Sequence, residues 1–137
     1  MPRRHEARRQ AIDILYQADV LGEHPVDVAE EWVAAGKKVA PFARQLVEGV
    51  ADHLDELDRV LGEHAEGWAV PRMPSLDRTI LRVGCYELLH RPDIPQGAAI
   101  DEAVETAKQL STEDSGRFVN GVLGKIAREL APSDPAR

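Results

Sequence analysis

The chain is poor in cysteine, in aromatic residues and in long apolar runs. Its single cysteine, Cys85, cannot form an internal disulfide, which fits a reducing compartment. No run approaches the roughly 18 apolar residues of a transmembrane helix, so no membrane span is expected. The basic start could imitate a signal peptide, but Asp13, Gln17 and Asp19 interrupt any apolar region. These absences predict a cytoplasmic protein.

Patterns typical of β-strands are missing as well. Apolar residues recur with helical spacing almost throughout, and they do not alternate with polar residues over a useful length. We therefore predict an all-α fold, a compact bundle of six or seven helices in one domain over 1–131, and a disordered tail over 132–137. The expected helices cover 3–21, 26–35, 41–61, 75–90, 96–110 and 114–131. The third is compatible with a break near His53, and Ser75 can cap the fourth.

The side chains that would assemble a catalytic or metal centre are also missing. The five histidines are scattered, with no HExxH or CxxC spacing. Glu87 and His90 form one Glu-x-x-His pair, whereas a di-iron bundle needs two such pairs and two further carboxylates. The segment GVLGKI at 121–126 lacks the first glycine and the final Ser/Thr of a phosphate loop. We expect no enzyme activity, no cofactor and no metal.

Positive charge is scarce overall but gathers at the N-terminus. The net charge is -7, yet the first ten residues hold Arg3, Arg4, Arg8 and Arg9 against the single acid Glu6. A helical wheel places an apolar stripe on one side of this segment, formed by Ala7, Ala11, Ile14, Leu15, Ala18 and Leu21. The opposite, solvent-facing side carries His5, Arg8, Arg9, Ile12 and Tyr16.

This combination of charge and aromatic ring is suited to nucleic acid. Arginine binds phosphates bidentately, and unpaired bases stack on planar rings. The alternative is an ordinary solvated helix start with Tyr16 packed on a neighbouring helix.

The last helix offers a second candidate ring, Phe118. Its core stripe consists of Val119, Val122, Leu123, Ile126 and Leu130. Phe118 lies about 90° from the centre of that stripe, on the side of Asp114 and Lys125. It is therefore either a ring at the rim of a binding surface or a core residue.

Four segments, in this order, together resemble the NusB family of bacterial transcription antitermination factors. They are RRHEARRQAIDILYQ (3–17), DRTILRVGCYELL (77–89), AAIDEAVETAKQL (98–110) and EDSGRFVNGVLGKI (113–126). The resemblance covers about residues 3–130, and its most specific parts are 80–88 and 118–123.

The resemblance implies a non-catalytic adaptor. Its fold would be two small helical subdomains packed across each other, about 1–61 and 75–131. It would bind boxA RNA together with NusE, a small-subunit ribosomal protein. Within the antitermination complex of RNA polymerase it would support transcription of ribosomal RNA operons.

The resemblance also assigns residues to the two partners. Arg3, Arg4, Arg8 and Arg9 match the basic tract of the RNA surface, and Tyr16 matches a further position on it. Asp114 and Phe118 match the start of the last helix, which closes the RNA site. Asp77 matches a contact with NusE in a one-to-one complex. An acidic body could attract a basic ribosomal protein, although acidity could equally serve solubility.

Two other functions stay open. One is the RNA-binding appendage of an RNA cytosine methyltransferase, which shares this fold; a catalytic methyltransferase is not expected, because the chain stops at Arg137 without an α/β cofactor domain. The other is a protein-only helical adaptor whose arginines meet an acidic partner. The sequence does not decide between a monomer and a homodimer.

Overall fold

The structure is a computed structural model that describes residues 2–130, with side chains described from Arg4 onward. Within that range it contains seven α-helices, one short 3-10 helix and no strand. The elements are α1 (Pro2–Leu21), α2 (Pro25–Ala34), α3 (Pro41–Asp52), α4 (Leu54–His64), η1 (Val70–Arg72), α5 (Ser75–His90), α6 (Gln96–Leu110) and α7 (Glu113–Leu130). The predicted all-α fold is confirmed, and the predicted tail lies outside the described residues.

Local sequence signals account for most of the helix ends. Gly22 follows α1 with φ +70°, a left-handed conformation that costs glycine little. Pro25 and Pro41 open α2 and α3, where the missing N–H is not needed. His53 separates α3 from α4, so the predicted break is real.

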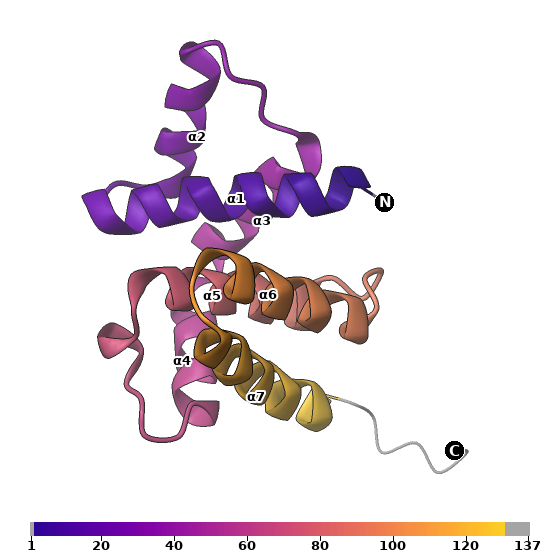
Figure 1. The fold of residues 1–137 in the computed structure, drawn as a ribbon. Helices are drawn as coiled ribbons and strands as arrows, with labels where there is room; N and C mark the ends of the chain where they lie inside the picture. The colour runs from indigo at the N-terminus through magenta and orange to yellow at the C-terminus, as the bar shows by residue number, and fades with distance from the viewer. Residues whose placement is uncertain (1, 131–137) are drawn as a thin grey trace.

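The described helices share one hydrophobic core. Helix α1 lies above α5 and α6 in the view of Figure 1. Helix α1 contacts α2, α3 and α5, and α5 also contacts α3, α4, α6 and α7. At two crossings a glycine allows close approach: the ring of Tyr86 lies against the backbone at Gly49, and the side chain of Leu123 lies against Gly84. As the most widely contacted helix, α5 positions the surfaces carried by α1 and α7.

Some local expectations were wrong. Ser75 is the first residue of α5 and makes no capping hydrogen bond, because Pro74 occupies the N-cap position. Leu21 and Leu130, expected in the core stripes, are exposed at the ends of their helices, where no neighbour covers them. Ile12, expected on the solvent-facing side of α1, is buried.

The division into two subdomains stays a prediction, and the contacts of α4 bear on where a boundary would fall. Helix α4 packs against α5 and α7 and only slightly against α3. In Figure 1, α1, α2 and α3 lie in the upper half and α4 to α7 in the lower half. This arrangement favours a boundary near His53 over one near residue 61.

None of the described helices is long and apolar enough to cross a membrane.

Candidate nucleic-acid interface

The basic end of α1 lies over an aromatic ring at the start of α3. The guanidinium of Arg4 lies 4.7 Å from the centre of the Phe42 ring and pairs with Asp93 at 3.6 Å. Arg91, from the turn after α5, lies 5.3 Å from the same ring and donates two hydrogen bonds to Asp93. We call Arg4, Phe42 and Arg91 the Phe42 cluster. The side chain of Arg3, also predicted to bind RNA, lies outside the described residues.

Arg8 is buried between helices. It is only 7% exposed, and its Nε and Nη2 donate hydrogen bonds of 2.9 to 3.2 Å to the carboxylate of Glu87, which is 2% exposed. Glu102 lies 3.8 Å away on α6. The predicted solvent-facing placement of Arg8 is wrong, because α5 packs on that side of α1. The resulting ion pair ties α1 to α5.

Arg9 and Tyr16 keep part of their surface open. Arg9 Nη1 donates to Gln109 Oε1 on α6 at 2.9 Å, and Tyr16 is 40% exposed. Seven residues are about two helical turns, so both side chains lie on the same side of α1. That side is the described part of α1 best placed to meet a ligand.

A groove extends the basic surface from α1 to the segment before α3. Its lining includes Arg4, Lys37, Lys38, Val39 and Phe42. Gln10 holds this segment in place, since its side chain donates to the carbonyl of Lys38 and accepts from the N–H of Ala40. The ammonium of Lys37 lies 4.4 Å from the centre of the Trp32 ring. The groove therefore combines a backbone held by Gln10 with several cationic side chains.

The remaining predicted residues meet in a pocket between α5, α7 and the loop before α5. The lining residues are Trp68, Pro74, Asp77, Asp114, Ser115 and Phe118. Asp77 was assigned to NusE, whereas Asp114 and Phe118 were assigned to RNA. The structure thus brings residues predicted for two different partners to one place.

Asp77 is buried in this pocket. It is 5% exposed, and its Oδ2 accepts a hydrogen bond of 3.1 Å from Ser115 Oγ. Its Oδ1 is buried without a hydrogen-bond partner among the described residues. Burial raises the pKa of the Asp77 carboxyl, and the Ser115 hydrogen bond opposes this only in part. An unsatisfied buried carboxylate oxygen favours a donor that enters from outside.

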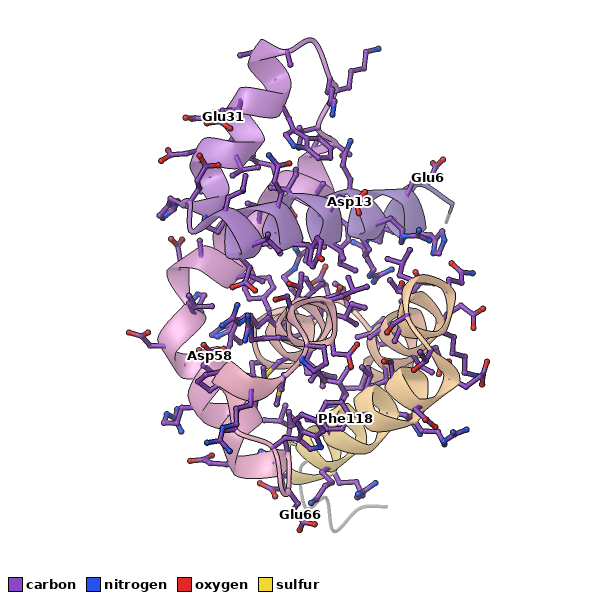
Figure 2. All side chains as sticks on the ribbon, turned by 60° about the vertical axis from the view of Figure 1, so that its left-hand side comes forward. Glu6, Asp13, Glu31, Asp58, Glu66 and Phe118 are labelled. Carbon is purple, nitrogen blue, oxygen red and sulfur yellow. The ribbon has the colours of Figure 1, made fainter. Side chains whose placement is uncertain are left out.

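The rim of the pocket is aromatic and acidic. Phe118, labelled in Figure 2, is half-buried. Its ring centre lies 5.9 Å from that of Trp68 in the preceding loop, and the two ring planes differ by 56°. Trp68 is 46% exposed. Asp114 is exposed and pairs with Arg117 one turn further along α7. Phe118 therefore has both a packed side and an open side, so neither sequence-based reading of it is complete.

Sequence reasoning missed Trp68, Phe42 and Arg91. A large aromatic residue in a Gly- and Pro-rich loop is a weak signal that could have drawn attention to Trp68. Phe42 has the position of a core residue in its helix, and Arg91 directly follows α5, so neither was singled out as a binding residue. Among the described residues, one group of close metal-ligand side chains exists, His53, Glu56 and His90, and it lies outside both surfaces.

Known proteins resemble this chain over most of its length. The NusB family model matches residues 5–128. Transcription antitermination protein NusB of Salinispora arenicola is 47% identical over 131 residues, covering 93% of this chain and 96% of that protein. The protein of the same name from Saccharopolyspora erythraea is 51% identical over 130 residues, covering 93% and 88%.

Solved structures share the fold. NusB of T. maritima superposes with a TM-score of 0.84 at 36% identity, covering 94% of this chain and 93% of that one. A chain from the crystal structure of antitermination factors NusB and NusE in complex with dsRNA gives a TM-score of 0.83 at 29% identity, covering 94% and 98%. Sequence and structure agree over nearly the whole length, and the chain belongs to the NusB family.

Proposed function

We propose that this chain is a non-catalytic adaptor that binds boxA RNA together with NusE. In this role it joins the antitermination complex of RNA polymerase in the cytoplasm and supports transcription of ribosomal RNA operons. Family membership supports the antitermination role. A related chain in a complex of NusB, NusE and dsRNA supports the two partners.

The observation that carries the joint binding is the shared pocket of Asp77, Asp114 and Phe118. If NusE approaches Asp77 and RNA approaches Phe118, the two partners are neighbours on this chain. Each would then cover surface beside the other, so binding one would favour binding the other. A surface divided in this way suits an adaptor.

The arginines of α1 bind RNA phosphates in this proposal. Arg4 and Arg9 supply guanidiniums to phosphate oxygens, and Arg91 of the Phe42 cluster adds a further cation beside Arg4. Arg3 is assigned the same role by the family resemblance. Tyr16 and Phe118 offer rings for bases. Arg8 contributes to RNA binding indirectly. Its ion pair with Glu87 holds α1, the helix that carries the other arginines, in place.

NusE reaches Asp77 by inserting a basic side chain into the pocket. The unpaired Oδ1 supplies the acceptor, and Trp68 supplies an aromatic wall for the aliphatic part of a lysine or arginine. A basic side chain is favoured because Asp77 and Asp114 are both acidic. Charge reversal by Asp77→Lys should therefore weaken NusE binding, by about 2–5 kcal/mol for a buried contact.

A titration of the full chain with boxA RNA tests the proposal. Affinity is measured with and without NusE, against a scrambled RNA of equal length. We expect boxA to bind more tightly than the scrambled RNA, and NusE to raise the affinity for boxA. If NusE binds but neither RNA does under any condition, the chain is a protein-only adaptor and the RNA assignments fail. Equal affinity for both RNAs with NusE present would remove boxA as the ligand.

A further inference from the structure

Three metal-ligand side chains from three helical segments meet at one point. His53 sits between α3 and α4, Glu56 lies in the first turn of α4, and His90 ends α5. Their candidate ligand atoms all lie within 4.8 Å of one another. Glu56 Oε1 is 2.6 Å from His90 Nε2 and 3.6 Å from His53 Nδ1. We call these three residues the His53 cluster.

The two imidazole rings are stacked. Their centres are 3.9 Å apart and their planes differ by 21°. Tyr86 lies beside both rings, with its centre 5.5 Å from that of His90 and 6.0 Å from that of His53. Each imidazole has a ring nitrogen whose lone pair can bind a metal ion.

The three side chains of the His53 cluster favour transition-metal ions. Two imidazoles and a carboxylate are the protein ligands of many zinc sites that keep an open position, and imidazole also suits copper, nickel and iron. Bonds of about 2.0–2.2 Å to a tetrahedral ion place ligand atoms roughly 3.3–3.5 Å apart. The present separations bracket that range. To complete the site, the Glu56–His90 hydrogen bond must open and one imidazole must turn out of the stack, because each ring nitrogen binds a metal ion in the plane of its own ring.

An entry path is present. A hollow lined by Ala51, Asp52, His53, Leu54, Asp55 and Glu56 opens onto the cluster from solvent. Asp52 and Asp55 are exposed and add negative charge at its mouth. The cluster itself is partly exposed, with His90 at 27% and Glu56 at 40% side-chain exposure. A hydrated cation could therefore enter, exchange water for ligands and keep water in the remaining position.

We propose that His53, Glu56 and His90 bind one divalent transition-metal ion of the Zn²⁺ class. The ion would join the α3–α4 junction to the end of α5. At this point the two are now connected by the Glu56–His90 hydrogen bond and by the stacked rings of His53 and His90. This site was not predicted from the sequence, because only His53 and Glu56 are close in the chain, whereas His90 comes from another helix. Glu87 and His90, the Glu-x-x-His pair of the sequence, have different partners in the structure. Glu87 binds Arg8, and His90 binds Glu56.

The test uses the tag-free full chain, Zn²⁺ for affinity by calorimetry and Co²⁺ for visible absorption. We expect one ion per chain, a Co²⁺ spectrum with nitrogen and oxygen ligands, and a thermal midpoint that rises with Zn²⁺ concentration. His90→Ala and Glu56→Gln should each weaken Zn²⁺ binding at least tenfold.

His5→Ala is the matched control. His5 Nδ1 lies 2.7 Å from Glu102 Oε1, so it is also a His–Glu pair, but it has no second imidazole. Its loss should leave Zn²⁺ affinity within twofold of the wild type. An equal loss in His5→Ala and His90→Ala, or a wild type that binds no more tightly than His90→Ala, would overturn the proposal. If the cluster variants unfold, imidazole nitrogen NMR shifts of the wild type decide it: Zn²⁺ must move those of His53 and His90 together.

Discussion

Arg8 and Glu87 form a buried bidentate ion pair across 79 residues of sequence, and this pair holds α1 against α5. Taking two charges out of water is costly, and their attraction offsets that cost only while both partners are present. The pair therefore contributes mainly by fixing the geometry of α1 on the rest of the protein. The open arginines and Tyr16 depend on that geometry for their position.

Removing one partner of this pair should destabilise the fold. Arg8→Ala leaves the Glu87 carboxylate buried and uncompensated, and we expect a loss of about 3–5 kcal/mol in the free energy of unfolding. Arg4→Ala is the control, because the exposed Arg4–Asp93 pair should contribute about 0–1 kcal/mol. Urea denaturation measures both. A loss below about 1 kcal/mol for Arg8→Ala would show that the pair is not a structural tie.

The arginines at the start of α1 should bind RNA without regard to its sequence. Replacing Arg3 and Arg4 together by alanine should weaken boxA and scrambled RNA alike, because phosphates carry no sequence information. Each lost contact to single-stranded RNA should reduce the slope of log affinity against log salt by about 0.7. Fluorescence anisotropy at several salt concentrations measures the slope. Arg59→Ala, which removes an exposed arginine of α4, should leave RNA binding unchanged. A selective loss for boxA in the double variant would contradict the phosphate role.

Phe118→Ala should behave differently from the arginine variants. Losing a stacked ring should weaken boxA binding by about 1–3 kcal/mol while leaving the salt slope nearly unchanged. Because Phe118 also packs against Trp68 and the core, its thermal stability is measured alongside. Normal boxA binding by a destabilised but folded variant would make Phe118 a core residue and confine RNA to α1.

Asp77 should make stability depend on pH in a defined direction. Burial raises the pKa of its carboxyl above the ordinary 3.8, so the folded state holds the proton more tightly than the unfolded state. This stabilisation is complete below pH 3.8 and is lost as pH rises through the folded-state pKa. Relative to the wild type, Asp77→Asn should therefore gain stability as pH rises from below 3.8 to 7.

Urea unfolding of both proteins across that pH range gives the difference directly. Other titrating groups are shared by the two chains and largely cancel. A difference that is constant with pH would mean that the Asp77 carboxyl does not have a raised pKa. NusE binding measured on the same samples should fall in Asp77→Asn, so the variant would be more stable and yet bind its partner less well.

Gly49 should not tolerate a side chain. A Cβ there would enter the ring of Tyr86 at the crossing of α3 and α5, and we expect Gly49→Ala to cost about 1–3 kcal/mol. Gly121→Ala is the matched control in a helix, since nothing lies within 4 Å of its added Cβ. That change should stabilise by up to about 1 kcal/mol. Thermal unfolding of both variants checks the contrast, and equal effects would contradict the close crossing.

The helices themselves were predictable from local signals. The bounds of 75–90 and 96–110 agree with α5 and α6, and the expected break near His53 separates α3 from α4. These signals are reliable because a helix is built from contacts three and four residues apart, which the sequence displays directly. Helix ends were less certain, as Ser75 shows: the residue has the chemistry of a cap, but it lies one position too late.

The candidate site was predictable only as a set of residue types. Arginines, Tyr16 and Phe118 could be singled out from the wheel, whereas the family resemblance was needed to assign Asp77 and Asp114. Neither source indicated that Asp77 would be buried with one oxygen unpaired, because its burial depends on α7 and the loop of Trp68. The same holds for Phe42, whose ring the structure places beside three guanidiniums from distant parts of the chain.

Periodicity, glycine, proline and charge content were thus enough to establish an all-α chain with a basic start. Packing then selected which polar side chains became structural and which stayed available. Arg8 and Arg9 are neighbours with the same chemistry, yet Arg8 meets a buried carboxylate on α5 while Arg9 reaches Gln109 and stays half-exposed. The same packing gathers His53, Glu56 and His90. Such outcomes depend on how distant segments cross, and the energy of a charge depends on the burial and partners that those crossings create.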